Sequence, residues 1–137
     1  MNVTLDECFQ FGLGAFETIG IEQGIPILLD KHLKRLERAA DFLKLGSLSE
    51  RGITARKIEK YLEEQKMRTE VQKEFRNLEH CALKIMLTKE NMVYSLRANH
   101  YTPEKYEKGF FIDISAVKRN ETSPLVYHKT MNYGDCI

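Results

Sequence analysis

Lys129 is the side chain of this 137-residue chain best suited to covalent chemistry, because of its neighbours. It lies between Tyr127 and Met131, with Tyr133 following, rather than in a run of charges. A lysine that acts as a nucleophile needs a fraction of neutral amine, which requires a lowered pKa or a site that excludes water. Aromatic and apolar neighbours are compatible with such a site. They are also compatible with a solvated lysine before a polar turn, which is the commoner case.

Three other sequence blocks precede the Lys129 segment. In chain order the four are Phe11-Gly12-x-Gly14-x-Phe16-Glu17-Thr18-Ile19, His32-x-x-Arg35-Leu36, Leu83-Lys84-Ile85, and Arg119-Asn120-x-x-Ser123-Pro124-Leu125 followed by Lys129-Thr130-x-Asn132-Tyr133. Each block is weak by itself, but four in this order resemble the fold-type IV pyridoxal-phosphate enzymes. The resemblance is greatest to the 4-amino-4-deoxychorismate lyases, with branched-chain and D-amino-acid aminotransferases as more distant relatives.

The resemblance implies a role for four side chains. Lys129 would be the catalytic residue, which carries pyridoxal 5'-phosphate covalently and then acts as general base and acid. Arg35 would contact the cofactor phosphate, for which its planar fork is suited. Tyr133 would hydrogen-bond the ring oxygen of the cofactor, and Lys84 would meet a substrate carboxylate. No metal ion is implied.

Each of these residues also has a plainer interpretation. Arg35 projects to the border of the apolar stripe of its helix, where an ordinary ion pair with a carboxylate is common. Lys84 could lie at a sheet margin with its amine in water, and Tyr133 could be a packed aromatic residue. His32 projects to the apolar side of the same helix, so we expect it to be packed and hydrogen-bonded. The other histidines lack a partner at metal-ligand spacing.

The resemblance implies elimination of pyruvate from 4-amino-4-deoxychorismate to give 4-aminobenzoate, a folate precursor. One alternative is a class IV aminotransferase for a branched-chain or D-amino acid. Another, from a different class, is a non-catalytic interaction module. Gly20 departs from the family pattern, since many relatives carry a basic residue after the opening motif.

Full-length members of this family are roughly twice as long, so the resemblance implies an N-terminal half. We expect an N-terminal domain over residues 1–118, and an interdomain linker with the start of a second domain over residues 119–137. The second domain would supply much of the cofactor pocket, so this chain alone is expected to be inactive. Its tail is expected to be loosely held or to dock on a second copy, because relatives are homodimers.

The pattern of apolar residues predicts an α+β domain, with a small antiparallel sheet flanked by helices. Strands are expected at residues 16–21, 25–29, 81–88, 92–98 and 110–116, and helices at about 30–45 and 54–66. Asp30 is expected to cap the first helix and Gly46 to end it. The charged stretch 67–79 either extends the second helix or forms another. Gly12 and Gly14 lack the rest of a phosphate loop, so a tight turn or a close backbone approach explains them better.

Composition excludes several classes of protein. The apolar fraction is 42% and the charged fraction 30%, which fits a globular protein and argues against disorder. A net charge of +1 with both signs interspersed gives no electrostatic case for nucleic acid or an anionic membrane. Three cysteines without Cys-x-x-Cys spacing suit reduced thiols. A cytoplasmic protein is therefore expected, and the resemblance implies a small-molecule substrate.

Overall fold

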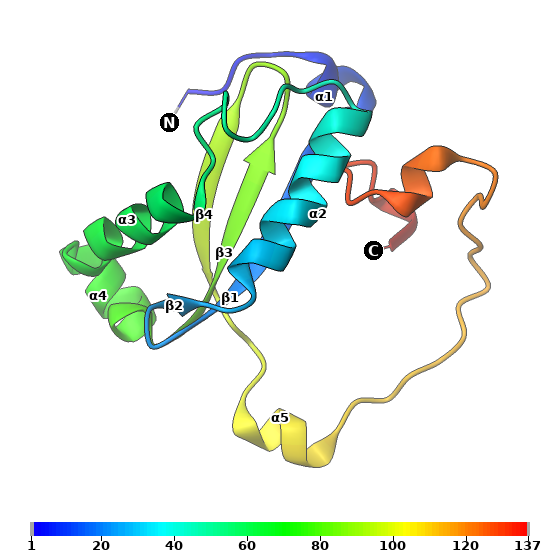
Figure 1. Cartoon of the computed structure of the whole chain (residues 1–137). Helices are drawn as coiled ribbons and strands as arrows, with labels where there is room; N and C mark the ends of the chain where they lie inside the picture. Colours follow the sequence, from blue (N-terminus) through cyan, green and yellow to red (C-terminus); the bar gives the residue numbers. More distant parts are fainter. Residues whose placement is uncertain (1, 137) are drawn as a thin grey trace.

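A four-stranded antiparallel sheet in the order β2-β1-β3-β4 forms the centre of the molecule. The computed structural model describes residues 2–136. The strands are β1 (Ala15–Glu22), β2 (Ile25–Pro26), β3 (His80–Leu87) and β4 (Met92–Ala98). The helices are α1 (Glu7–Phe11), α2 (Leu29–Phe42), α3 (Ala55–Lys66), α4 (Thr69–Phe75) and α5 (Pro103–Lys108), with 3-10 turns at Arg76–Leu78, Pro124–Tyr127 and Gly134–Cys136. Figure 1 shows α2 lying across the sheet. The predicted α+β class and antiparallel sheet are confirmed.

One face of the sheet forms the hydrophobic core with α2 and α3. Alternate residues of β1 and β3 point to this face, and nearly all are fully buried: Ala15, Ile19, Ile21, Cys81, Leu83, Ile85 and Leu87. Leu36 and Ala40 of α2 and Ile58 of α3 pack in the same cluster. Each buried Leu or Ile contributes about 1.5–3 kcal/mol relative to exposure. The predicted alternation in β3 and the apolar stripe of α2 are confirmed.

The two ends of α2 differ from the prediction. The helix begins at Leu29 after Leu28, whose φ is 51°, and no side chain caps it, so Asp30 lies inside the first turn. It ends at Phe42, before the predicted Leu45. Lys44 (φ 55°) adopts the left-handed conformation, and the amide of Leu45 donates to the Ala40 carbonyl. The chain turns early because Leu45 then enters the core, where it is 5% exposed. Gly46 therefore lies beyond the end of the helix.

The other predicted elements hold except for two strands. Thr54 caps α3 through the Lys57 amide, and residues 67–79 form α4 and a 3-10 turn rather than an extension of α3. The predicted strand over residues 25–29 is only Ile25–Pro26, because Leu28 already adopts the left-handed conformation that precedes α2. Gln23 and Gly24 form the turn before it, both with positive φ, as a tight hairpin requires.

Residues 110–116 do not form the predicted strand. They follow α5 and are paired with no strand of residues 2–136. Phe111 and Ile112 are almost fully exposed. Figure 1 shows this part of the chain looping away from the sheet. Alternating apolar residues indicate strand propensity, but a strand also needs a neighbour that accepts its hydrogen bonds.

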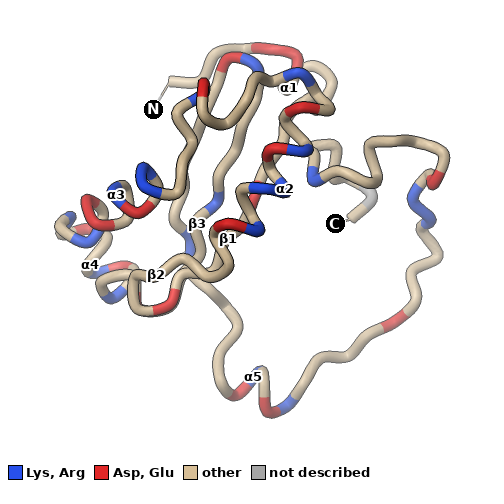
Figure 2. Tube along the Cα trace, viewed as in Figure 1, with Lys and Arg blue, Asp and Glu red and all other residues tan. Residues whose placement is uncertain are grey.

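Charges of both signs are interspersed over the helices. Figure 2 shows Lys and Arg alternating with Asp and Glu along α2 and α3. No helix of the described residues is long and apolar enough to cross a membrane.

The two glycines of the opening motif serve the purposes expected of them. Gly12 ends α1 in the left-handed conformation, with φ 72°. Gly14 lies where α1, the end of β3 and Met131 meet. A Cβ atom at Gly14 would lie 2.8 Å from Cys8 Sγ, 2.9 Å from Met131 Sδ and 3.2 Å from the Leu87 carbonyl oxygen. Close approach of these segments therefore requires glycine at position 14.

Replacing Gly14 by alanine should lower the free energy of unfolding by about 1–3 kcal/mol, the usual cost of overpacking. The matched control is Gly20→Ala within β1, where an added Cβ atom meets nothing within 4 Å. This control should be neutral or slightly stabilising, because glycine in a strand interior is unfavourable. Urea unfolding of the two variants measures the difference. Equal stability of the two proteins would contradict the proposed steric role of Gly14.

Candidate active site

The segment that contains Lys129 lies against the free edge of β1. Ala15 and Thr130 form an antiparallel bridge, the Phe16 amide donates to the Lys129 carbonyl at 3.2 Å, and the Met131 amide donates to the Gly14 carbonyl at 2.7 Å. Thr130 is 2% exposed. The edge is available because β2 pairs only with the far end of β1. The expectation of a loosely held tail is therefore wrong for this segment.

The amine of Lys129 lies over two aromatic rings. Its Nζ atom is 4.5 Å from the centre of the Phe16 ring and 5.4 Å from that of Tyr133. Burial lowers the pKa of Lys129; the Glu17 carboxylate opposes this change, and the charges of Arg35 and Lys84 add to it. The net effect is a larger fraction of neutral amine, which nucleophilic chemistry requires.

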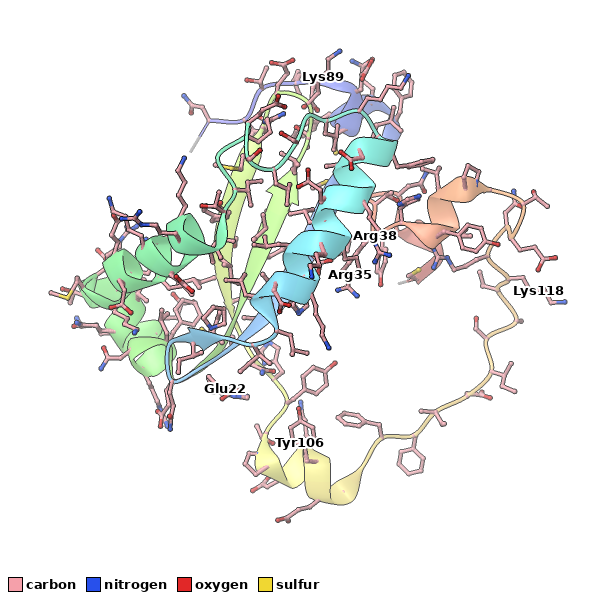
Figure 3. All side chains as sticks on the ribbon, in the orientation of Figure 1. Glu22, Arg35, Arg38, Lys89, Tyr106 and Lys118 are labelled. Atoms are coloured by element: carbon pink, nitrogen blue, oxygen red, sulfur yellow. The ribbon has the colours of Figure 1, made fainter. Side chains whose placement is uncertain are left out.

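Arg35 forms a two-point ion pair with a buried carboxylate. Its Nε atom is 2.5 Å from Glu17 Oε1 and its Nη2 atom 2.7 Å from Glu17 Oε2. Glu17 is fully buried, whereas the Arg35 side chain is 46% exposed. This is the ion pair that the helical projection suggested. Figure 3 shows Arg35 projecting from α2 on the side of the C-terminal segment. Among the side chains that the structure describes, those of residues 2–134 and 136, none accepts a hydrogen bond from its Nη1 atom.

His32 completes the group around Glu17. Its Nδ1 atom lies 2.8 Å from Glu17 Oε2, which confirms the packed and hydrogen-bonded histidine expected from the sequence. Burial of the Glu17 carboxyl raises its pKa, but the hydrogen bonds and charges of Arg35 and His32 outweigh this and hold the pKa below its ordinary value. Glu17 is therefore ionised at neutral pH.

Sequence reasoning assigned no role to Glu17. The sequence does contain a signal for Glu17. It lies in the same inward-facing row of β1 as Ala15 and Ile19, and it is the one charged residue of that row. A carboxylate at an inward strand position needs a buried partner. That pattern, combined with an arginine on the border of the next helix, would have indicated the pair.

Lys84 and Tyr133 surround the same phenylalanine. The Nζ atom of Lys84 is 5.0 Å from the centre of the Phe16 ring, and the Tyr133 ring packs edge-on against Phe16 at 5.3 Å. The structure thus brings the four predicted site residues, Lys129, Arg35, Tyr133 and Lys84, to one end of β1. The roles inferred from the resemblance stay predictions.

The histidines do not contribute to this site beyond His32. The ring of His128 stacks on Phe42 at 4.2 Å, although it is the residue next to Lys129. Alternation in an extended segment explains this, because neighbouring side chains point to opposite sides. Among the described residues, no three His, Cys, Asp or Glu side chains form a group that could hold a metal ion.

Replacing Glu17 by glutamine should lower the free energy of unfolding by about 2 kcal/mol at pH 7. Removing one partner of a fully buried pair costs about 3–5 kcal/mol, and the exposure of Arg35 reduces this figure. Because the pKa of Glu17 is lowered on folding, its contribution is complete above its ordinary value of 4.5 and disappears as the pH falls below it. Urea unfolding from pH 7 to pH 3 should therefore show the two proteins converging in stability. A difference independent of pH would contradict the ionised pair.

Comparisons with known proteins agree with this arrangement. A stretch of 40 residues, 29% of this chain, is 48% identical to the aminodeoxychorismate lyase of Bacillus subtilis (strain 168), of which it covers 14%. The fold matches a crystal structure assigned as a 4-amino-4-deoxychorismate lyase with a TM-score of 0.74 and 23% identity. That match covers 98% of this chain and 51% of the other, so the chain spans about half the length of the solved relative. The family described as amino-transferase class IV matches residues 14–137, and the chain therefore belongs to the class IV aminotransferase family.

Proposed function

We propose that this chain is the N-terminal part of a pyridoxal-phosphate-dependent lyase that removes pyruvate from 4-amino-4-deoxychorismate and releases 4-aminobenzoate. The observation that carries the proposal is the Lys129 amine, which lies over Phe16 and Tyr133 with a lowered pKa. The names of the curated relative and of the solved neighbour support the lyase reaction.

The described residues suit a cofactor that carries an aldehyde, an aromatic ring and a phosphate. Lys129 offers an amine with increased neutral character, and this amine lies over the ring of Tyr133, which carries a hydroxyl. Arg35 offers the part of its guanidinium that Glu17 does not engage. Lys84 and Lys129 both lie over the Phe16 ring, and two amines at one ring favour an anionic group beside them.

Each residue then has a defined task. When bound, pyridoxal 5'-phosphate takes up the electrons released as substrate bonds break. Lys129 would hold the cofactor through its amine, and its released amine would accept a proton from the substrate and return one. Glu17 would fix the guanidinium of Arg35 on the cofactor phosphate. Tyr133 would donate to the ring oxygen of the cofactor, and Lys84 would bind a substrate carboxylate.

A class IV aminotransferase for branched-chain or D-amino acids is the second candidate. The family description favours this second candidate. The same residues would take part in both reactions up to the step at which a proton is returned. The two candidates differ in products. A lyase releases pyruvate and 4-aminobenzoate without an amino acceptor, whereas an aminotransferase consumes a 2-oxo acid and forms a new amino acid.

Borohydride reduction of the full-length protein loaded with pyridoxal 5'-phosphate should attach the pyridoxyl group to Lys129. Peptide mass mapping locates the modified residue independently of activity. The Lys129→Ala protein should stay folded and lose pyruvate release by at least about 10²–10⁴-fold, the usual contribution of a positioned general base.

Lys118→Ala is the matched control, since Lys118 is an exposed lysine of the preceding segment. It should keep both labelling and activity. Attachment of the pyridoxyl group to another lysine would refute the role of Lys129. Amino transfer without pyruvate release would instead support the second candidate.

A further inference from the structure

The face of the sheet opposite the core presents a row of cations. Side chains of β1 and β3 alternate between faces, so Phe16, Thr18 and Gly20 point away from the core, as do Lys84 and Ala82. Lys129 and Lys84 both lie over the Phe16 ring, which places both amines on this outer face.

Arg97 of β4 belongs to the same face. Register pairs Arg97 with Ala82, and Ala82 with Gly20, in one line across three strands. Lys84 pairs with Ser95 in the neighbouring line, so Lys84 and Arg97 are diagonal neighbours, about 7–8 Å apart at the backbone. Lys129, Lys84 and Arg97 therefore follow one another diagonally across the outer face.

The surface between these cations is open at Gly20. An added Cβ atom at Gly20 would meet nothing within 4 Å, so there is open space above the line that ends at Arg97. Ala82, the middle residue of the line, has only a methyl group. A planar ligand has room above Gly20, with Arg97 at the far end of the same line.

Arg97 has no partner for its charge among the described side chains of residues 2–134 and 136. It is exposed, and no hydrogen bond or ion pair to the described residues engages it. The next line of the face contains Glu22, but His80 already binds that carboxylate at 2.7 Å. A guanidinium beside a second unpaired cation on an open surface has a natural ligand in a carboxylate.

We propose that Arg97 binds a carboxylate at the end of the substrate remote from Lys129, and that Arg97 and Lys84 together select substrates with two carboxylates. This inference rests on the proposed reaction centre at Lys129, and it identifies a specificity residue on β4. The reacting amine at Lys129, one carboxylate at Lys84 and a second at Arg97 would orient the substrate along the diagonal.

A different role for Arg97 must be distinguished by experiment. β4 is the edge of the sheet, and charged residues on edge strands prevent pairing between molecules. That role needs only a positive charge, so lysine would preserve it. Carboxylate recognition uses the two-pronged geometry of arginine, which lysine does not reproduce.

Binding of benzoate and of isophthalate, which has one more carboxylate on the same ring, tests the proposal. The dissociation constants of the two ligands are measured by calorimetry on the full-length protein loaded with pyridoxal 5'-phosphate. The parent should bind isophthalate more tightly than benzoate. Arg97→Gln should weaken isophthalate binding about tenfold and benzoate binding less than twofold, and Arg97→Lys should recover only part of the loss. Arg38→Gln, which removes an exposed arginine of α2, should change neither constant.

Three results would overturn the inference: a parent that does not prefer isophthalate, an Arg97→Gln protein with unchanged binding, or equal losses for both ligands. Full recovery by Arg97→Lys would likewise favour the edge role. The lyase reaction is tested separately. A parent that releases no pyruvate but shows the Arg97-dependent preference would refute the proposed reaction and leave this inference standing. A protein that is an active lyase but whose ligand preference does not depend on Arg97 would refute this inference and leave the proposed reaction standing.

Discussion

The buried carboxylate of Glu17 is the constraint to which the candidate site is tied. Moving an ionised carboxylate out of water costs several kcal/mol unless well-placed partners compensate. Arg35 and His32 are those partners, and both come from α2. The position of α2 on the sheet is thereby fixed by polar geometry as well as by the packing of Leu36 and Ala40. The same charge acts on Lys129, where it opposes the fall in pKa that burial causes.

A second polar network lies at the same end of the sheet, at the hairpin between β3 and β4. Asp6 is 7% exposed and accepts hydrogen bonds from the Thr88 hydroxyl, the Glu90 amide and the Asn91 side chain. These bonds, that of Thr88 first, outweigh burial and lower the pKa of Asp6. They hold the N-terminal segment on the hairpin between β3 and β4, so that α1 reaches Met131 through Cys8. In this way α1 contacts the Lys129 segment where that segment lies on the edge of β1.

Local patterns in the sequence were sufficient for most of the sheet and for α3. The alternation from Cys81 to Leu87 and the cap at Thr54 depend on neighbours in the chain, so they can be read without knowledge of the fold. The early end of α2 depends on the burial of Leu45, and residues 110–116 lack a strand to pair with; both are tertiary facts. Likewise, Arg35 and Lys129 could be identified by family motifs. The inward position of Glu17 could have indicated a buried pair with Arg35, and the structure was needed to give its two-point geometry. Only the strand register shows that Arg97 lies on the same face of the sheet as Lys84.

The core face of the sheet contributes to stability, whereas the side chains of the outer face are suited to binding a ligand. On the core face, the single charged side chain of the β1 row is neutralised by α2, so that face can bury apolar surface without an unpaired charge. On the outer face, Lys84 and Arg97 have no anionic partner among the side chains described for residues 2–134 and 136. Lys84, Lys129 and Tyr133 all contact Phe16. The two lysines at one ring gain only about 0.5–2 kcal/mol each from such cation–π contacts, so stability alone does not explain the cations of this face. Their arrangement is better explained by an anionic, planar ligand, because such a ligand would satisfy both the charges and the open surface above Gly20.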